Sequence, residues 1–440
     1  MSHRFYLQVR YKLFLSLGFA VTWCGVSTWL ALPWIADLTA LVGTAGAWVA
    51  VAGIALIPGF ANAFMLGSML LDRRPTQWRV TDPPPLSVLI AAFNEERHIA
   101  ETLCSVIAQH YPAAIEIIVI DDGSTDATVA RTEACASGDA LPPAMTLRVL
   151  RTPRNGGKAN ALNAGLAEAR FAHVVSLDAD TYLYRDALRN IALNHINSPP
   201  NTAATAGTIL VRNSRTNLVT RMQEWDYFQG IAVVKRVQSL YQGTMVAQGA
   251  FSIYDKARLE EIGGWTQTVG EDIVLTWGLI SHDYRVGYAE NAFAFTNVPE
   301  TLGAYIRQRK RWARGLMEAF RQWPGVLIRP RLNLPFIYLN LLFPYLDLVY
   351  FLVFLPGVIA AVFFQFYAVV GLLTLLLIPL ALSISLVMLA KQHRVFRTAG
   401  LHVRRNVMGF LGYVLAYQMI LSPASLAGYF SEFLNFRKSW

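Results

Sequence analysis

Long apolar runs at the two ends of the chain restrict its fold more than any other feature. Two of them open the sequence, at residues 13–35 and 41–71. Each is long enough to cross a bilayer, which takes about 20 residues of helix. The first run exceeds the apolar core of a secretory signal peptide, and the second follows it closely. We therefore expect two membrane-spanning helices within residues 1–74.

The last part of the chain, residues 332–440, holds three further apolar runs, at 334–363, 367–390 and 407–430. The loop between the last two is basic, and basic loops stay in the cytosol. The same rule assigns the N-terminus and the polar middle of the chain to the cytosol. This count predicts a multi-pass protein of the cytoplasmic (inner) membrane with its C-terminus outside, against which Arg437 and Lys438 argue.

The composition agrees with a membrane protein. Hydrophobic residues make up 54% of the chain and charged residues 15%, whereas soluble domains carry about 25% charged residues. The net charge of +9 suits nucleic acid, anionic lipid or phosphorylated substrates. Because the basic residues gather beside the apolar runs, we expect contacts with the lipid bilayer and the substrate, and no nucleic-acid partner.

The middle of the chain, residues 75–300, has the pattern of alternating strands and helices. Strand-length apolar runs lie at 86–92, 116–121, 146–150 and 173–178, and helical stretches lie between them at 95–109, 126–136 and 158–169. This alternation predicts an α/β domain with a mainly parallel sheet and helices on both faces. Ligands bind at the carboxyl ends of the strands in such sheets, so the polar residues at these ends are the candidates for a binding site.

Two of these strand ends carry segments that suit a nucleotide. Asn94 follows the first strand, and Asp121 and Asp122 end the second, just before Gly123. An Asp here can accept a hydrogen bond from a base or a ribose, and the glycine allows a tight turn. Taken alone, the Asp-Asp-Gly-Ser-Thr-Asp segment is better explained by a turn followed by a helix cap.

A glycine pair stands before the third helical stretch. Gly156 and Gly157 precede Lys158 at the helix start. Glycines at a helix N-terminus suit phosphate oxygens, and the lysine adds a positive charge. The alternative is a glycine-rich loop that ends in a solvated lysine.

Two carboxylates follow the fourth strand. Asp178 and Asp180 are separated by one alanine. Carboxylate oxygens are the ligands that Mg²⁺ and Mn²⁺ prefer, and such an ion shares diphosphate oxygens. The pair therefore predicts a metal site for a nucleoside diphosphate.

A further acidic pair begins a later helix. Glu271 and Asp272 follow Gly270, and a carboxylate at this place can accept the proton of a sugar hydroxyl. A simple N-cap without chemistry is the alternative.

Residues 301–331 read as an amphipathic helix that can lie in the membrane interface. Gln308, Arg311 and Trp312 share one face, where they can bind a diphosphate and stack on a sugar ring. Arg309 and Lys310 are expected to face elsewhere, towards lipid.

Together these motifs resemble, in order over residues 83–315, the processive membrane β-glycosyltransferases of family 2. The resemblance extends to cellulose, chitin and hyaluronan synthases. It implies a GT-A (Rossmann-like) catalytic domain inserted between transmembrane helices, with an interface helix after it.

The resemblance also implies roles for single residues around the nucleotide. Asp122, or its neighbour Asp121, would contact the uracil or ribose of a UDP-sugar, with Asn94 nearby. Lys158 would lie near the diphosphate, and Asp178 would contact the nucleotide.

Other residues would serve the metal and the reaction. Asp180 would bind Mg²⁺ or Mn²⁺, and Asp272 would be the catalytic base, although many members have Thr where Gly270 stands. The residues implied for the diphosphate and the acceptor are Gln248, Gly249, Glu271, Gln308, Arg311 and Trp312.

Length and layout are most similar to bacterial poly-β-1,6-N-acetylglucosamine synthases. This similarity implies UDP-N-acetylglucosamine as donor, a growing polysaccharide as acceptor and a small membrane partner subunit. Residues 248–251 lack the cysteine of cellulose synthases, and no cyclic-nucleotide-binding extension is expected, so cellulose synthase is disfavoured. The alternatives are a polymerase of another sugar (glucan, chitin-like or hyaluronan-like), a non-processive enzyme that adds one sugar to a lipid, and a catalytically silent subunit.

One carboxylate lies inside an apolar run. Asp347 and Asn340 are seven residues apart, nearly on one helical face, and intramembrane carboxylates are costly unless they have a partner. We expect the two residues to line a polymer path or to contact a partner subunit. The alternative is an ion pair between Asp347 and an arginine near the interface.

Overall fold

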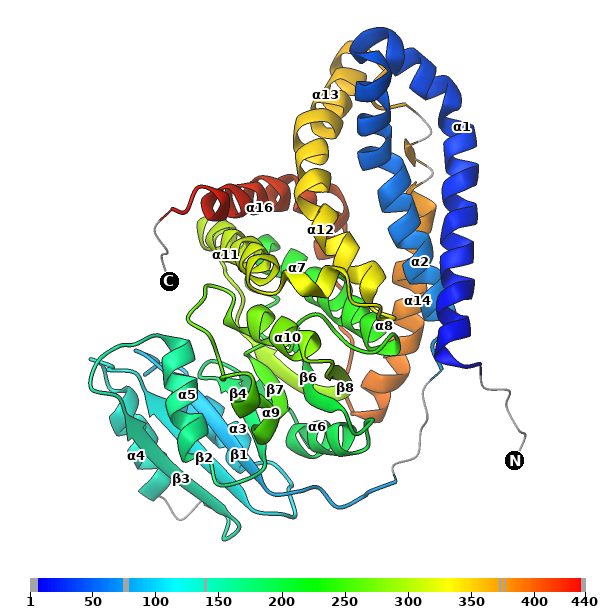
Figure 1. Cartoon of the computed structure of the whole chain (residues 1–440). Coiled ribbons are helices and arrows are strands. Elements are labelled where there is room, and N and C mark those ends of the chain that lie inside the picture. Colours follow the sequence, from blue (N-terminus) through cyan, green and yellow to red (C-terminus); the bar gives the residue numbers. More distant parts are fainter. Residues whose placement is uncertain (1–6, 74–78, 138–140, 372–373, 376, 437–440) are drawn as a thin grey trace.

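The computed structural model describes residues 7–73, 79–137, 141–371, 374–375 and 377–436. Arg74, Arg437 and Lys438, which entered the predicted topology, lie outside these residues. Long helices form one end of the molecule, and a domain of strands and helices forms the other (Figure 1).

A sheet of eight strands forms the centre of the α/β domain, in the order β3-β2-β1-β4-β7-β6-β8-β5. The strands are β1 (Leu86–Ala92), β2 (Ile115–Asp121), β3 (Met145–Arg151), β4 (His173–Asp178), β5 (Tyr182–Leu183), β6 (Thr202–Val211), β7 (Phe251–Asp255) and β8 (Arg285–Thr296). The four strands β3, β2, β1 and β4 are parallel, and β7 runs antiparallel to β4. The first four strands confirm the predicted ones, and the sheet is mixed beyond them.

Helices cover both faces of the parallel strands. On one face Val88 and Ile90 of β1 pack in the same cluster as Leu103 of α3 (Ile99–Ile107). On the other face Leu89 packs with Leu162 of α5 (Lys158–Glu168). Successive residues of a strand point to opposite faces, so a strand covered on both sides is apolar throughout. This explains the unbroken apolar runs in the sequence.

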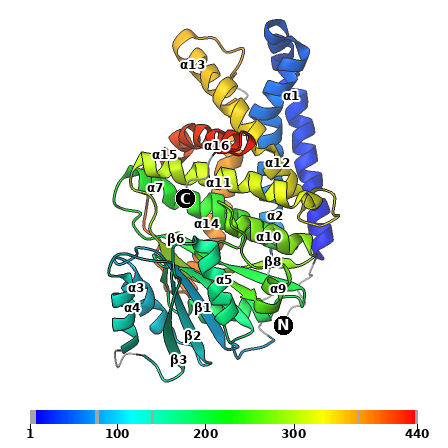
Figure 2. The same cartoon turned by 60° about the vertical axis from the view of Figure 1, so that its left-hand side comes forward.

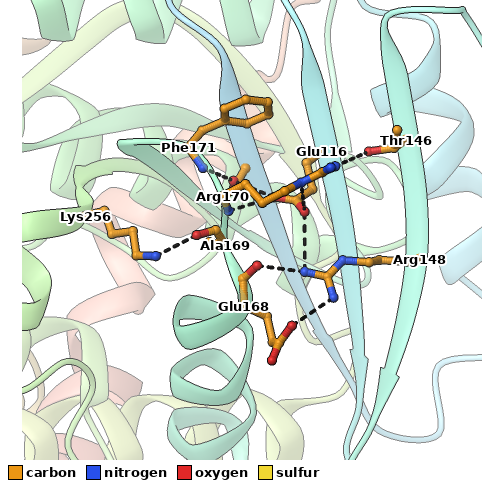
Figure 3. Close-up of polar contacts among 9 residues, drawn as sticks. Glu116, Thr146, Arg148, Glu168, Ala169, Arg170, Phe171 and Lys256 are labelled. Carbon is orange, nitrogen blue, oxygen red and sulfur yellow. Dashed lines mark hydrogen bonds and ion pairs between the residues drawn. The ribbon is translucent and has the colours of Figure 1, made fainter.

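A buried carboxylate connects neighbouring strands by polar contacts at the edge of the sheet opposite the carboxyl ends of the strands. Glu116 of β2 is fully buried and accepts hydrogen bonds from Ser87 Oγ at 2.9 Å and Arg170 Nε at 2.8 Å (Figure 3). Arg148 Nη2 lies 3.4 Å from Glu116 Oε1. Burial alone would raise the pKa of Glu116, but the hydrogen bonds and charge of these partners lower it. Glu116 therefore stabilises the fold. It is not part of the expected ligand site, because it lies away from the carboxyl ends of the strands.

The other helices surround this sheet or belong to the helical end. They are α4 (Thr128–Ser137), α6 (Ala187–Ile196), α7 (Leu218–Trp225), η2 (Asp226–Val233), α8 (Val234–Leu240), α9 (Lys256–Glu261), α10 (Glu271–Ser281), α11 (Leu302–Gln322), η3 (Pro324–Leu327), α12 (Leu334–Val349), η4 (Tyr350–Phe354), α13 (Leu355–Phe364), α14 (Leu377–Thr398), α15 (Val407–Gly412), η6 (Tyr413–Tyr417) and α16 (Gln418–Phe433).

The N-terminal apolar runs form a helical hairpin. It is made of α1 (Val9–Val51), η1 (Ala52–Leu56) and α2 (Ile57–Leu71), and α1 turns back on itself near its far end (Figure 1). Gly43 has φ 73° there, a conformation that breaks the helix. The two legs touch, because a Cβ on Gly67 would lie 3.5 Å from the Cα of Ser16.

Among the described residues three helical segments are long and apolar enough to cross a membrane, namely Val9–Leu71, Leu334–Phe364 and Val407–Phe433. They contain four of the five predicted runs. The run at 367–390 falls partly on α14 and partly on residues outside the described ones, so its span stays a prediction.

The last of these segments lies in an unexpected direction. In both views α16 runs beside α11 and crosswise to α1 (Figures 1 and 2). The packing is close, because a Cβ on Gly428 would lie 2.4 Å from the backbone oxygen of Lys310.

Asp347 joins two helices of the helical end. Its carboxylate accepts hydrogen bonds from Ser422 Oγ at 2.7 Å, Gln418 Nε2 at 3.1 Å and the Tyr429 hydroxyl at 3.1 Å. These partners lie on α16, so Asp347 links α12 to α16. The alternative of an arginine partner is wrong for the described residues, and the proposed polymer path stays a prediction.

The junction between the hairpin and the α/β domain is made of charged groups. Asp72 follows α2 and is buried, and its carboxylate pairs with Arg236 of α8 at 2.6 Å. Arg236 also pairs with Glu290 of β8, and Lys391 of α14 donates to the backbone oxygen of Asp72 at 3.0 Å. We call these four residues the Asp72 junction.

Candidate active site

Three motifs that are far apart in the sequence meet at Lys158. Its Nζ atom lies 2.5 Å from Asp178 Oδ1, at the end of β4, and 3.3 Å from Glu271 Oε1, at the start of α10. Lys158 itself begins α5, directly after the glycine pair. The strand ends and the two helix starts thus converge at one edge of the sheet, as the topology predicted.

The site holds more negative than positive charge. Burial and the neighbouring carboxylates of Asp178 and Glu95 raise the pKa of Asp180 to about 6. Burial also raises the pKa of Glu271, against the effect of Lys158. Burial would lower the pKa of Lys158, but Asp178 and Glu271 outweigh it and raise the pKa above its ordinary value. A cation would relieve this excess of carboxylates.

Gly249 makes room for the lysine. A Cβ at this position would lie 2.7 Å from Lys158 Nζ and 3.6 Å from Glu271 Oε1. The backbone oxygen of Gly249 accepts from Ser176 Oγ at 3.2 Å, which fixes the segment against β4. The glycine therefore lets the amine reach its two carboxylates.

Asp272 lies in the first turn of α10, one residue after Glu271. Its Oδ1 accepts from the backbone N–H of Ile273 at 2.7 Å, and its Oδ2 accepts from the backbone N–H of Gly249 at 3.3 Å. These bonds hold the carboxylate in place next to the Lys158 group. An acid group in this position can accept a proton from a bound hydroxyl.

The two aspartates at the end of β2 accept hydrogen bonds from the backbone of neighbouring loops. Asp122 is buried and accepts from the backbone N–H groups of Gly156 at 3.0 Å and Gly157 at 2.7 Å. Asp121 is also buried, and its Oδ1 accepts from the backbone N–H of Ser124 at 3.2 Å. Both carboxylates therefore shape the loops beside Lys158, and their contact with a nucleotide stays a prediction.

Asn94 lies on the exposed side of the same loops. Its Oδ1 accepts from the backbone N–H of Thr125 at 2.9 Å, and its backbone adopts φ 56°. Asn tolerates this left-handed conformation better than most residues. Asn94 thus joins the end of β1 to the loop after β2.

Two glutamines carry free acceptors. Among the described residues, the Oε1 atoms of Gln248 and Gln308 are buried and have no hydrogen-bond partner. Gln248 Nε2 donates to the backbone oxygen of Gly207 at 2.6 Å, so Oε1 is the atom of the Gln248 amide that lacks a hydrogen-bond partner. Buried acceptors without partners are rare in folded proteins, so both side chains are candidates for binding a ligand.

Arg311 and Trp312 are exposed on α11. Arg311 makes no ion pair within the part of the chain that the structure describes, which leaves its guanidinium available. The Trp312 ring is 6.3 Å from the ring of Tyr227, centroid to centroid. Both side chains are therefore accessible on α11, and their contact with a diphosphate and a sugar stays a prediction.

Arg309 does not face lipid, and that expectation is wrong. Its side chain is buried, its Nη2 lies 2.9 Å from Asp226 Oδ2, and its guanidinium carbon lies 4.0 Å from the Trp312 ring centroid. A charged group is stable inside a protein only when it is paired, and Asp226 supplies the partner. Asp226 stands in the aromatic sequence Trp-Asp-Tyr-Phe, a signal that could have revealed the pair.

Sequence reasoning also missed Lys235 of α8. Its amine is buried and has no hydrogen-bond partner among the described residues. Burial lowers the pKa of Lys235 to about 7, although the charge of Asp272 opposes the shift. A lysine beside Arg236 in a short, partly polar helix gives no signal by itself.

The residues fit a divalent cation that is shared with a phosphorylated ligand. Asp178 and Asp180 offer carboxylate oxygens at the strand end, and Asp180 carries the raised pKa. Within the described residues no three His, Cys, Asp or Glu side chains form a complete metal cage. An ion here would therefore take further oxygen ligands from the ligand or from water.

The chain is similar to two named bacterial enzymes over about half of its length. A poly-β-1,6-N-acetyl-D-glucosamine synthase of Staphylococcus epidermidis is 33% identical over 244 residues, which cover 55% of this chain and 57% of that protein. The same enzyme of Staphylococcus aureus is 32% identical over 246 residues, 56% of this chain and 57% of that protein. The chain thus spans less than two thirds of the length of these relatives.

The fold has a likeness among solved structures. A mannosyltransferase from Pyrobaculum calidifontis, solved with GDP-Man and Mn²⁺, matches with a TM-score of 0.58 at 19% identity and covers 88% of this chain and 99% of that chain. This match supports the GT-A fold expected from the sequence. The model named glycosyltransferase like family 2 matches residues 83–315, more than half of the chain. With this match and the strand-end site in agreement, the chain belongs to glycosyltransferase family 2.

Proposed function

We propose that the protein transfers a sugar from a UDP-sugar, namely UDP-N-acetylglucosamine, to the end of a growing polysaccharide. The observation that carries the proposal is the position of Lys158 between Asp178 and Glu271. Through these two contacts Lys158 connects Asp178, the residue expected to bind the nucleotide, to α10, the helix that carries Asp272. The names of the two Staphylococcus relatives support this sugar and a polymeric product.

The reaction is a single displacement with inversion. Asp272 accepts the proton of an acceptor hydroxyl, and the oxygen of that hydroxyl forms a bond to the anomeric carbon of the donor. The bond between this carbon and the diphosphate oxygen breaks, and UDP leaves with the electron pair. The backbone N–H of Gly249, 3.3 Å from Asp272 Oδ2, helps to keep the carboxylate oriented for this step.

The departing diphosphate meets positive charge on two sides. Lys158 stands at the strand ends, and Arg311 is exposed on α11. A Mg²⁺ or Mn²⁺ ion held by Asp180, with Asp178, would neutralise charge on the leaving UDP when bound. Stabilisation of developing charge is usually the largest contribution to such a rate, so both cations should affect turnover strongly.

The acceptor sugar is expected on the side of α11. The exposed Trp312 can stack on the apolar face of a sugar ring, and Gln308 and Gln248 have open acceptor atoms for its hydroxyl groups. Repeated addition follows if the product stays on this face after each transfer. The length of the product on a gel distinguishes a polymerase from an enzyme that adds one sugar to a lipid.

We further infer a multi-pass protein of the cytoplasmic membrane with its catalytic domain in the cytosol. The apolar hairpin and the basic segment of residues 391–405 support this orientation. The polymer would leave through the membrane part, alone or with a small membrane partner subunit.

The test is the substitution Asp272→Asn in the full-length protein in membranes. We expect the variant to bind UDP with the affinity of the native protein and to lose sugar transfer by about 10²-fold or more, since it cannot accept the proton. Incorporation of radiolabelled sugar, screened over several UDP-sugars, measures transfer, and calorimetry with UDP measures binding.

Asp255→Asn is the matched control. Asp255 caps α9 by accepting from the backbone N–H of Ala257 at 3.0 Å, and Asn is an equally good cap. Native turnover is expected there. Retained turnover in the Asp272 variant would refute the base, and no incorporation by the native protein with any UDP-sugar would refute the function.

A further inference from the structure

Glu318 of α11 is a buried carboxylate that the proposed reaction does not use. Its side chain is only 4% exposed. Oε2 accepts hydrogen bonds from the backbone N–H groups of Val269 at 2.8 Å and Gly270 at 3.1 Å. These are the two residues directly before α10, where Asp272 lies. Carboxylates that accept from the free N–H groups at a helix start are among the stronger hydrogen bonds in proteins.

A second contact holds the same segment one turn earlier on α11. A Cβ on Gly270 would lie 2.6 Å from the Cα of Gly315, and a Cβ on Gly315 would lie 2.7 Å from the Cα of Gly270. The two backbones therefore touch without side chains between them. With Glu318, this contact fixes the start of α10 at two points along α11.

The position of Asp272 follows from this attachment. Gly270 is the N-cap of α10, and its backbone oxygen accepts the first helical bond, from Val274, at 3.0 Å. Only Glu271 stands between Gly270 and Asp272. A shift of Gly270 therefore moves the Asp272 carboxylate with it.

α11 is itself fastened to α16 beside Glu318. Arg314, one turn before Glu318, pairs with Glu432 of α16 at 2.8 Å and donates to the backbone oxygen of Phe436 at 2.6 Å. Arg321, almost one turn after Glu318, lies 3.6 Å from the other oxygen of Glu432. The charges on either side of Glu318 thus belong to the contact with α16, and Glu318 faces the start of α10.

We propose that Glu318 is a positioning residue of the transfer reaction, which holds the start of α10 so that Asp272 meets the acceptor hydroxyl. The proposal rests on the proposed function, because it acts through the base of that reaction. Glu318 touches no reacting atom. Its role is to keep the distance between Asp272 and the acceptor face of α11 constant.

The test compares Glu318→Ala with Glu318→Gln in the full-length protein in membranes. Alanine leaves two N–H groups without an acceptor, whereas the amide oxygen of glutamine can still accept from both. We expect alanine to lower kcat by about 10²-fold, the typical effect of a misplaced catalytic group. The KM for the donor should change less than about twofold, and glutamine should restore most of the rate.

Two further measurements separate positioning from general damage. Combining Glu318→Ala with Asp272→Asn should give the rate of Asp272→Asn alone, because both changes remove the same step. Gln322→Ala is the matched control. Gln322 lines the same cavity of about 290 Å³ as Glu318 and Arg321, and native kinetics are expected there.

Hydrogen exchange at Val269 and Gly270 tests the contact without any substrate. Protection should fall in the alanine variant and persist in the glutamine variant, even if the sugar or the reaction proves to be different. Unchanged exchange, native kcat in the alanine variant, or independent effects of the two substitutions in the double variant would each overturn the proposal. Inactive native protein with altered exchange would instead count against the proposed function alone.

Discussion

At the scale of single residues, the site depends on glycines as much as on charged groups. Gly249 stands where a Cβ would meet the amine of Lys158, and the Gly156–Gly157 pair donates its N–H groups to Asp122. The sequence predicted Gly156 and Gly157 as phosphate-binding elements, and the family resemblance implied that Gly249 serves the diphosphate or the acceptor. Their visible role is to bring Lys158, Asp178 and Glu271 together, which a pattern of letters does not reveal.

Gly249→Ala is expected to disturb the Lys158 group without unfolding the domain. The new Cβ meets only the end of a flexible side chain, at 2.7 Å, so the lysine can move away at low cost. The amine then loses its contact with Asp178, and the KM for the UDP-sugar should rise several-fold while the unfolding temperature stays the same. Ala250→Gly, at the next position, is the control and should keep the native KM.

At the scale of elements, the sequence was most informative where both faces of an element are covered. β1 and β4 have the predicted bounds, β2 begins one residue earlier than predicted, and β3 extends one residue further at each end. The predicted bounds are close because polar turns follow these strands. The sequence pattern does not show which distant residues become neighbours in the folded protein. Arg309 read as a lipid-facing residue because Asp226, its partner, is 83 residues earlier in the chain. Glu318 carried no signal for the same reason.

The Asp226–Arg309 pair should be essential for joining η2 to α11. Replacing Arg309 by Met leaves Asp226 buried without a partner, which typically costs about 3–5 kcal/mol. Replacing both residues, as Asp226→Leu with Arg309→Met, should cost less than the single change. Unfolding in detergent with a chemical denaturant measures the free energy of unfolding of the native protein, the single variant and the double variant.

Arg258→Met provides the comparison at the surface. The pair of Arg258 and Glu261 is exposed on both sides, at 43% and 45%, and because solvent screens such pairs they add little to stability. If Arg309→Met is as mild as Arg258→Met, the buried pair has no special role in stability.

At the scale of the whole molecule, the direction of α16 changes the predicted topology. Five spans would put the C-terminus outside, yet α16 runs along α11 and crosswise to α1 (Figure 2). The residues after it are bound by the catalytic part, since Arg314 donates to Phe436 and Arg321 to Asn435 at 3.1 Å. Apolar composition alone could not separate a helix that crosses the bilayer from one that lies along it.

We predict that residue 434 and the catalytic domain lie on the same side of the membrane. Single cysteines at the exposed positions Leu434, Ser137 and Leu41 test this in a chain whose Cys24, Cys104 and Cys135 are replaced by serine. An impermeant maleimide should label the first two in inverted vesicles. Leu41, near the tip of the hairpin, should react in right-side-out vesicles, and labelling of position 434 there as well would restore the predicted five spans.

The Asp72 junction has a consequence for how repeated addition can proceed. Ion pairs and a hydrogen bond connect the end of α2 to α8, β8 and α14 at one point. A buried, paired charge resists separation, so the hairpin and the catalytic domain should move as one body. The distance between the site of bond formation and the bilayer then stays the same during each addition of a sugar. In the polymerisation that we propose, the product then advances because the chain of sugars slides past a domain that this junction holds in place.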